Sequence, residues 1–170
     1  MATRGGLLKH GVLIGLGAVV IGDIIFALIY PIALGIVSNF EIKSFFILFL
    51  TVALISGVTG LMASIIPGGI GGICLALLLN IDAVKGRLTL KKASLEGSLV
   101  GGLSGIISCL ISLFFIFGFT RPGSVFSYGI YDKSGYLEYI RLALITLLPV
   151  AISIFMGSWS GRRLAHRLID

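Results

Sequence analysis

A single acidic residue, Asp23, interrupts a long run of uncharged side chains between Gly11 and Asn39. A carboxyl group that leaves water for hydrocarbon is more stable in its neutral form, so an acid placed here can take up and release a proton or another cation. In an α-helix, Ala27 and Tyr30 lie one and two turns beyond Asp23 on the same face. Pro31 has no N–H to bond the carbonyl oxygen of Ala27, which leaves an acceptor free on that face. We therefore expect a polar site formed by Asp23, the Ala27 carbonyl and Tyr30.

Two hypotheses for Asp23 stay open at the level of the sequence. In the first, the carboxyl group takes part in the transport of protons or cations, because ionisable groups inside membranes are costly and generally functional. In the second, it is a protonated structural group that forms a hydrogen bond with a hydroxyl group of a neighbouring helix. The hydroxyl groups that could serve are those of Thr51, Thr59, Ser104, Ser108 and Thr146.

A proline followed by four glycines lies within the second apolar segment, from Pro67 to Gly72. Proline removes a helical hydrogen bond, and backbone that unwinds at membrane depth must be buried in protein or line water. Broken helices form substrate sites in transporters. The motif therefore predicts a second helix that is broken or kinked, with a re-entrant segment as the alternative. Pro67, Gly68 and Gly69 join Asp23 as candidate transport residues.

Small residues recur every four positions in the third and fourth apolar segments, which predicts helix faces that pack closely. The third segment carries a glycine zipper of Gly97, Gly101 and Gly105, and the fourth carries Gly157 and Gly161. These rows could pack the bundle internally or form the interface of an oligomer or larger complex. The stretch Gly11–Gly15 also resembles Gly97–Gly101, which is consistent with a duplication of two helices.

The elements that would position these residues follow from composition and segment length. Hydrophobic residues make up 57% of the 170-residue chain and charged residues 12%, against about 25% charged in soluble domains. Four apolar segments, at about 8–38, 45–80, 95–119 and 140–161, reach or exceed the ~20 residues that a helix needs to cross a bilayer. They lack the alternating pattern of barrel strands, so helices are expected. The predicted fold is all-α: one integral membrane domain, residues 1–170, forming a four-transmembrane-helix bundle with Gly/Ser packing faces. Ser94 is expected to cap the third helix.

The distribution of basic residues predicts how the bundle is oriented. Nine lie in the tails and the second connection: Arg4, Lys9, Lys85, Arg87, Lys91, Lys92, Arg162, Arg163 and Arg167. Four lie on the other side: Lys43, Arg121, Lys133 and Arg141. Because cytoplasmic loops are enriched in basic residues, we expect both termini in the cytoplasm, with anionic lipid headgroups nearby. The membrane is expected to be the cytoplasmic membrane of a prokaryote, while a thylakoid or organelle membrane would give the same pattern.

Several function classes lack the residues that they require. The two histidines, His10 and His166, lie at segment edges, and Cys74 and Cys109 have no neighbouring metal-binding partner, so no metal or haem is expected. There is no phosphate-binding loop, paired carboxylate set or Ser/His/Asp set. We therefore expect no enzyme activity and no cofactor. We also expect no nucleic-acid partner, since the positive charge flanks apolar spans instead of forming a separate basic surface.

Two functions fit the remaining pattern. The sequence favours a non-catalytic accessory or scaffold subunit that docks through the glycine zipper onto itself or onto other membrane subunits. The reason is that four helices are expected to leave little room for a solute path. The alternative is a small proton- or cation-coupled carrier or channel that uses Asp23.

Overall fold

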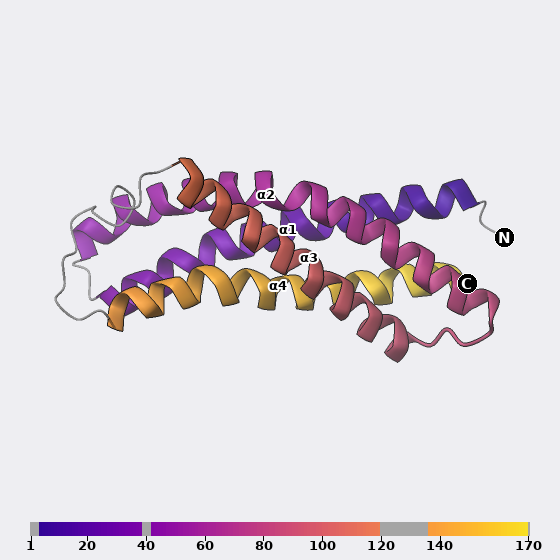
Figure 1. Cartoon of the computed structure of the whole chain (residues 1–170). Coiled ribbons are helices and arrows are strands. Elements are labelled where there is room, and N and C mark those ends of the chain that lie inside the picture. The colour runs from indigo at the N-terminus through magenta and orange to yellow at the C-terminus, as the bar shows by residue number, and fades with distance from the viewer. Residues whose placement is uncertain (1–3, 39–41, 120–135, 170) are drawn as a thin grey trace.

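The computed structural model describes residues 4–38, 42–119 and 136–169, which form four α-helices and no strand. These are α1 (Arg4–Ser38), α2 (Ile42–Val84), α3 (Leu90–Phe119) and α4 (Tyr136–Ile169) (Figure 1). The prediction of an all-helical fold is confirmed for this part of the chain.

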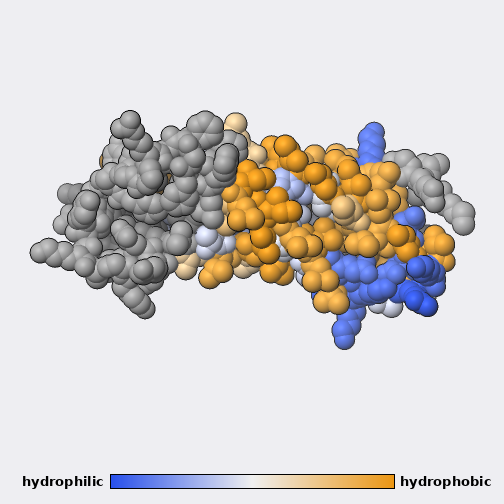
Figure 2. Space-filling view, viewed as in Figure 1, coloured by the Kyte–Doolittle hydropathy of each residue, from blue (hydrophilic) through white to orange (hydrophobic). Residues whose placement is uncertain are grey.

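The helices run along one long axis as two antiparallel pairs (Figure 1). The closest pairs are α1 with α2 and α3 with α4, and the pairs meet through α1 with α4 and α2 with α3. Both chain termini and the α2–α3 connection lie at the same end of the molecule, here called the basic end. Figure 2 shows hydrophilic residues gathered at this end and a band of hydrophobic residues beside it.

Three helices are long and apolar enough to cross a membrane, over Gly6–Ala33 in α1, Phe49–Val84 in α2 and Leu90–Ser112 in α3. Their outward faces carry large apolar side chains in regular rows. On α2, Leu54, Val58 and Met62 follow one another every fourth residue and are 57–73% exposed. Exposed rows of this kind are typical of surfaces that contact lipid or other protein. The structure therefore indicates a membrane protein.

Over its described residues, the fourth helix has no stretch that is both long and apolar enough to cross a membrane. The continuous part of α4 whose side chains are described, from Thr146 onward, ends in turns that carry Arg162, Arg163 and Arg167. Serine and glycine residues lower its hydropathy further. The prediction of a fourth span over about 140–161 is therefore wrong for this part of α4.

The second helix is continuous, which corrects the prediction of a break near Pro67. Helical geometry extends from Ile42 to Val84 without interruption through the segment Pro67–Gly72. Here the Ser104 hydroxyl group on α3 donates a hydrogen bond to the Pro67 carbonyl oxygen over 3.3 Å. The α1 and α4 helices likewise continue through their own prolines.

The α2–α3 connection is a tight turn with defined caps. Gly86 has a φ of 64°, a left-handed conformation that glycine adopts at helix ends without steric cost. The Thr89 hydroxyl oxygen accepts a hydrogen bond from the Lys92 amide over 3.2 Å and so caps α3. The expectation that Ser94 caps this helix is wrong, because α3 begins four residues before it, at Leu90. Ser94 instead lies beside Ser158 of α4, with 2.6 Å between the hydroxyl oxygens.

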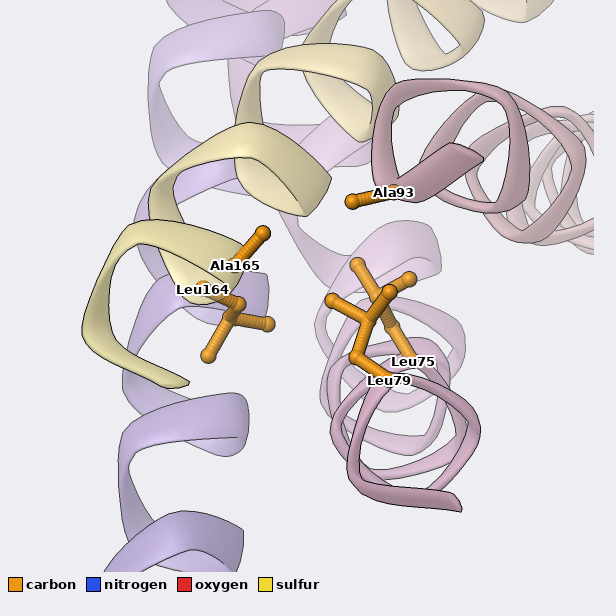
Figure 3. Close-up of a cluster of buried hydrophobic side chains, with 5 residues drawn as sticks. All are labelled: Leu75, Leu79, Ala93, Leu164 and Ala165. Atoms are coloured by element: carbon orange, nitrogen blue, oxygen red, sulfur yellow. The ribbon is translucent and has the colours of Figure 1, made fainter. Parts of the chain in front are cut away.

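A buried apolar cluster closes the bundle toward the basic end. It consists of Leu75 and Leu79 from α2, Ala93 from α3, and Leu164 and Ala165 from α4 (Figure 3). All five side chains are at most 3% exposed. We call this cluster the basic-end plug.

Candidate functional site: a cavity among the four helices

The α1 and α2 helices approach each other so closely that only glycine fits at their contact. A Cβ atom at Gly11 would lie 2.6 Å from the carbonyl oxygen of Gly72. One at Gly15 would lie 2.5 Å from the carbonyl oxygen of Gly68. Any larger residue at position 11 or 15 would therefore require the backbone of α2 to move.

The α3 and α4 helices meet in the same manner. A Cβ atom at Gly97 would collide with the carbonyl oxygen of Gly157, and one at Gly101 with the carbonyl oxygen of Ser153. At Gly105 the nearest atom would be the Ser153 Cβ, 2.7 Å away. The glycines of α3 singled out in the sequence thus lie against α4 of the same chain.

The partner glycines of α4 complete this contact. A Cβ atom at Gly157 would collide with the carbonyl oxygen of Gly97, and one at Gly161 with that of Ala93. Both obstacles are backbone atoms, which cannot move aside as the end of a side chain can.

A cavity of about 780 Å³ lies among the four helices. Its described lining comes from residues 14–30 of α1, 51–75 of α2, 97–112 of α3 and 149–164 of α4. Ligand pockets in proteins are typically ~300–1,000 Å³, so this space could hold a small organic molecule. The lining includes Leu75 and Leu164, which also belong to the basic-end plug, so the cavity ends there.

Asp23 lies in the wall of this cavity and contacts α2. Its Oδ2 atom accepts a hydrogen bond from the Ser64 hydroxyl group over 2.7 Å. The other oxygen, Oδ1, would be 3.0 Å from a Cβ atom at Gly60. The carboxyl group therefore fits beside α2 because residue 60 has no side chain.

The hydrogen bonds at Ser64 bear on the protonation of Asp23. The Ser64 oxygen lies 2.7 Å from Asp23 Oδ2 and 2.5 Å from the carbonyl oxygen of Gly60. A hydroxyl group has one hydrogen to donate but can also accept. Both short contacts are fully satisfied when Asp23 is protonated and donates to Ser64, which then donates to Gly60. When Asp23 is ionised, its carboxylate and the Gly60 carbonyl compete for a single hydrogen.

Two aromatic residues of α1 line the cavity near Asp23. Phe26 and Tyr30 follow it by three and seven residues, on the same side of the helix. Their rings stack with centroids 5.3 Å apart and an interplanar angle of 23°. The cavity therefore offers aromatic surface next to its carboxyl group.

Only some of the candidate transport residues predicted from the sequence line the cavity. Asp23, Tyr30 and Gly68 line the cavity, whereas Ala27, Pro67 and Gly69 are not part of its described lining. The Ala27 methyl group would be 3.4 Å from a Cβ atom at Gly57, so this part of α1 packs against α2. Pro67 is buried and Gly69 lies near the side chain of Leu16.

Ser64 and Gly60 are the site residues that sequence reasoning missed. Both belong to a row of small residues spaced by four, continued by Gly68 and Gly72, which face α1. Extending this row backward by two helical turns would have placed a hydroxyl group beside the only acid of the first apolar segment. The spacing was therefore an available signal.

A second polar cluster lies near the basic end, outside the described cavity lining. Lys92 Nζ lies 2.5 Å from Asp82 Oδ2 on α2 and 3.7 Å from Glu96 Oε1 on its own helix. This ion pair connects α2 to α3 next to the plug. Among the described residues no group of three or more metal-ligating side chains occurs, and both cysteines carry free thiols.

No protein-family model matches this sequence, and no curated protein or solved structure is significantly similar to it.

Proposed function

We propose that this protein is a small integral membrane carrier in which Asp23 binds and releases a proton or another cation inside the cavity. The observation that supports this proposal is the Asp23–Ser64 hydrogen bond at the wall of a space of about 780 Å³. A carboxyl group in an apolar span that faces a cavity is typical of proton relays and ion pathways.

The size of the cavity changes the balance between the two functions considered from the sequence. The accessory-subunit function was favoured because four helices were expected to leave little room for a solute path. A cavity large enough for a small molecule removes that reason. The basic-end plug favours a carrier over an open channel, because it closes one end of the cavity.

The proposal includes an orientation in the membrane. Both termini and the basic α2–α3 connection lie at one end of the molecule, because α4 runs back along α3 and α1 to that end. We therefore propose that all three lie on the cytoplasmic side. The side chains of Lys43, Arg121, Lys133 and Arg141, expected on the opposite side, lie outside the described residues. A prokaryotic cytoplasmic membrane remains part of the proposal.

The glycine rows have a place in this function as packing faces. We propose that the close contacts of α1 with α2 and of α3 with α4 hold each pair as a rigid unit. Dispersion forces between closely approaching backbones replace the hydrophobic effect, which is absent between helices in lipid.

The accessory-subunit function stays as a second proposal, with a changed interface. Because α4 of the same chain covers Gly97, Gly101 and Gly105, a partner subunit or second copy would dock elsewhere. Purification in mild detergent tests this. A defined complex that survives would support the subunit function, and a monomer would contradict it.

Reconstituted protein tests the carrier proposal. Liposomes that contain a pH-sensitive dye and a potassium-driven membrane potential would report proton flux, and radioactive sodium would report cation exchange. Wild-type protein should raise at least one flux above that of protein-free liposomes, and Asp23→Asn should remove the increase. Glu96→Gln, an acid outside the described lining, is the matched control and should keep it. Equal fluxes in wild type and Asp23→Asn would contradict the proposal.

A further inference from the structure

The charges of the cavity wall select the charge of its ligand. Asp23 is the only carboxylic acid in the described lining, and that lining contains no lysine, arginine or histidine. An ionised Asp23 therefore faces the cavity without a basic side chain in the described lining to neutralise it. A ligand with one positive charge would complement this wall, and a ligand with a negative charge would be repelled by it.

The size of the space decides between a bare metal ion and an organic cation. A cavity of about 780 Å³ would hold ~26 water molecules at roughly 30 Å³ each. Metal ions need several oxygen ligands in a compact shell, at ~2.0–2.6 Å for magnesium and calcium. Here a single carboxyl group stands among mostly apolar or hydroxyl-bearing residues, which do not form such a shell, and the volume beside it leaves room for the body of an organic cation.

The surroundings of Asp23 indicate how an organic cation would lie. The stacked rings of Phe26 and Tyr30 continue along α1 from the carboxyl group and line the same cavity. Aromatic faces attract ammonium groups and also pack well against apolar groups. The Ser64 hydroxyl group holds the carboxyl oxygen Oδ2, and Oδ1 lies beside Gly60, which also lines the cavity.

We infer that the cavity binds an organic ammonium ion with an apolar body, its charged nitrogen at Asp23 and its body against Phe26 and Tyr30. This inference rests on the proposed function, because it takes Asp23 as the group that exchanges its proton for the ligand. Bound ammonium would take the place of that proton as the partner of the carboxylate. The Ser64 hydroxyl group would then donate to the ionised Asp23.

Binding measurements with three matched probes test the ligand class. Dansyl groups on a six-carbon chain that ends in an amine, an alcohol or a carboxylate have the same apolar body and differ in charge. Protein in lipid nanodiscs is titrated with each probe, and empty nanodiscs correct for partition into lipid. We expect the amine to bind at least about tenfold more tightly than the alcohol, as for a charge-assisted hydrogen bond, and the carboxylate to bind most weakly.

The variant Asp23→Asn should remove the difference between the amine and the alcohol while both still bind. Glu96→Gln should keep it. Phe26→Leu should weaken binding of the amine and of the alcohol alike, since both probes place the same apolar body against this ring. Equal affinity of wild-type protein for all three probes would overturn the inference, and this comparison needs no variant to fold.

The outcome is separable from that of the flux experiment. Loss of flux in Asp23→Asn together with charge-independent binding would overturn the ligand class and keep the carrier function. Charge-selective binding without any flux in wild-type liposomes would overturn the carrier function and keep the ammonium site.

Discussion

The carbonyl oxygen of Gly157 lies so close to Gly97 that a Cβ atom at residue 97 would collide with it. The same contact recurs between α1 and α2, where a Cβ atom at residue 11 would lie 2.6 Å from the carbonyl oxygen of Gly72. The two helix pairs thus share one register of contacts. The sequence similarity between Gly11–Gly15 and Gly97–Gly101 has this structural counterpart, and duplication of a helical hairpin would account for both.

Substitution of Gly97 by alanine should destabilise the protein. Overpacking against backbone costs about 1–3 kcal/mol, whereas replacing a helical glycine by alanine gains at most ~1 kcal/mol. We expect a lower midpoint of thermal unfolding, followed by circular dichroism in detergent.

Gly102→Ala is the matched control on the same helix. Its Cβ atom would lie 3.2 Å from the Ile154 Cγ1, the part of a side chain that can rotate away. The midpoint of thermal unfolding of Gly102→Ala should therefore fall less than that of Gly97→Ala. Equal midpoints for Gly97→Ala and wild type would show that α3 and α4 do not depend on this close contact.

In the first helix pair, Gly72→Ala should also lower the unfolding midpoint. A Cβ atom at residue 72 would collide with the carbonyl oxygen of Gly11 and lie 3.1 Å from the Gly15 Cα. Gly69→Ala, three residues earlier, would place its methyl group an ordinary 3.8 Å from the Leu16 Cδ2. The two variants are measured side by side, and a Gly69→Ala midpoint as low as that of Gly72→Ala would contradict the contact.

Local sequence patterns predicted the helices but not every contact between them. Long apolar runs are enough to indicate helices, and Asp23 was recognisable because it is the only acid in its segment. The row of small residues on α2 indicates the helix face that contains Ser64, but the hydrogen bond itself joins residues 41 positions apart and depends on how α1 and α2 are aligned. The proline of α2 suggested a break that the structure lacks. A proline removes only one helical hydrogen bond, and the close packing of Gly68 and Gly72 against α1, which cannot be read from α2 alone, accompanies an unbroken helix.

The ion pair near the basic end should contribute to stability. Lys92→Met would leave Asp82 and Glu96 close together without the cation that lies between them. We expect a lower unfolding midpoint, since removal of one partner leaves unpaired charge.

Lys91→Met is the control for this prediction, because the ion pairs found among the described residues involve Lys92 and not Lys91. The double variant Asp82→Asn/Lys92→Met should recover part of the loss, since it removes one of the two repelling carboxylates. A double variant less stable than Lys92→Met alone would contradict an interaction between these residues.

The two cysteines allow a direct test of whether water enters the cavity. Cys109 on α3 lines the cavity, whereas Cys74 on α2 is exposed on the outside of the bundle within an apolar span. Thiols react as thiolates, which form in water and not in hydrocarbon. In liposomes, a charged thiol reagent should therefore modify Cys109 in the Cys74→Ser variant and leave Cys74 unmodified in the Cys109→Ser variant.

Mass spectrometry of the intact protein gives the extent of modification. Detergent-denatured samples of both variants should react completely, which controls for the reactivity of each thiol. If the dansyl amine occupies the cavity, it should also slow modification of Cys109, because both share the same space. Faster modification of Cys74 than of Cys109 in liposomes would mean that lipid, rather than water, fills the space beside Asp23, and a carrier built on that carboxyl group could not work.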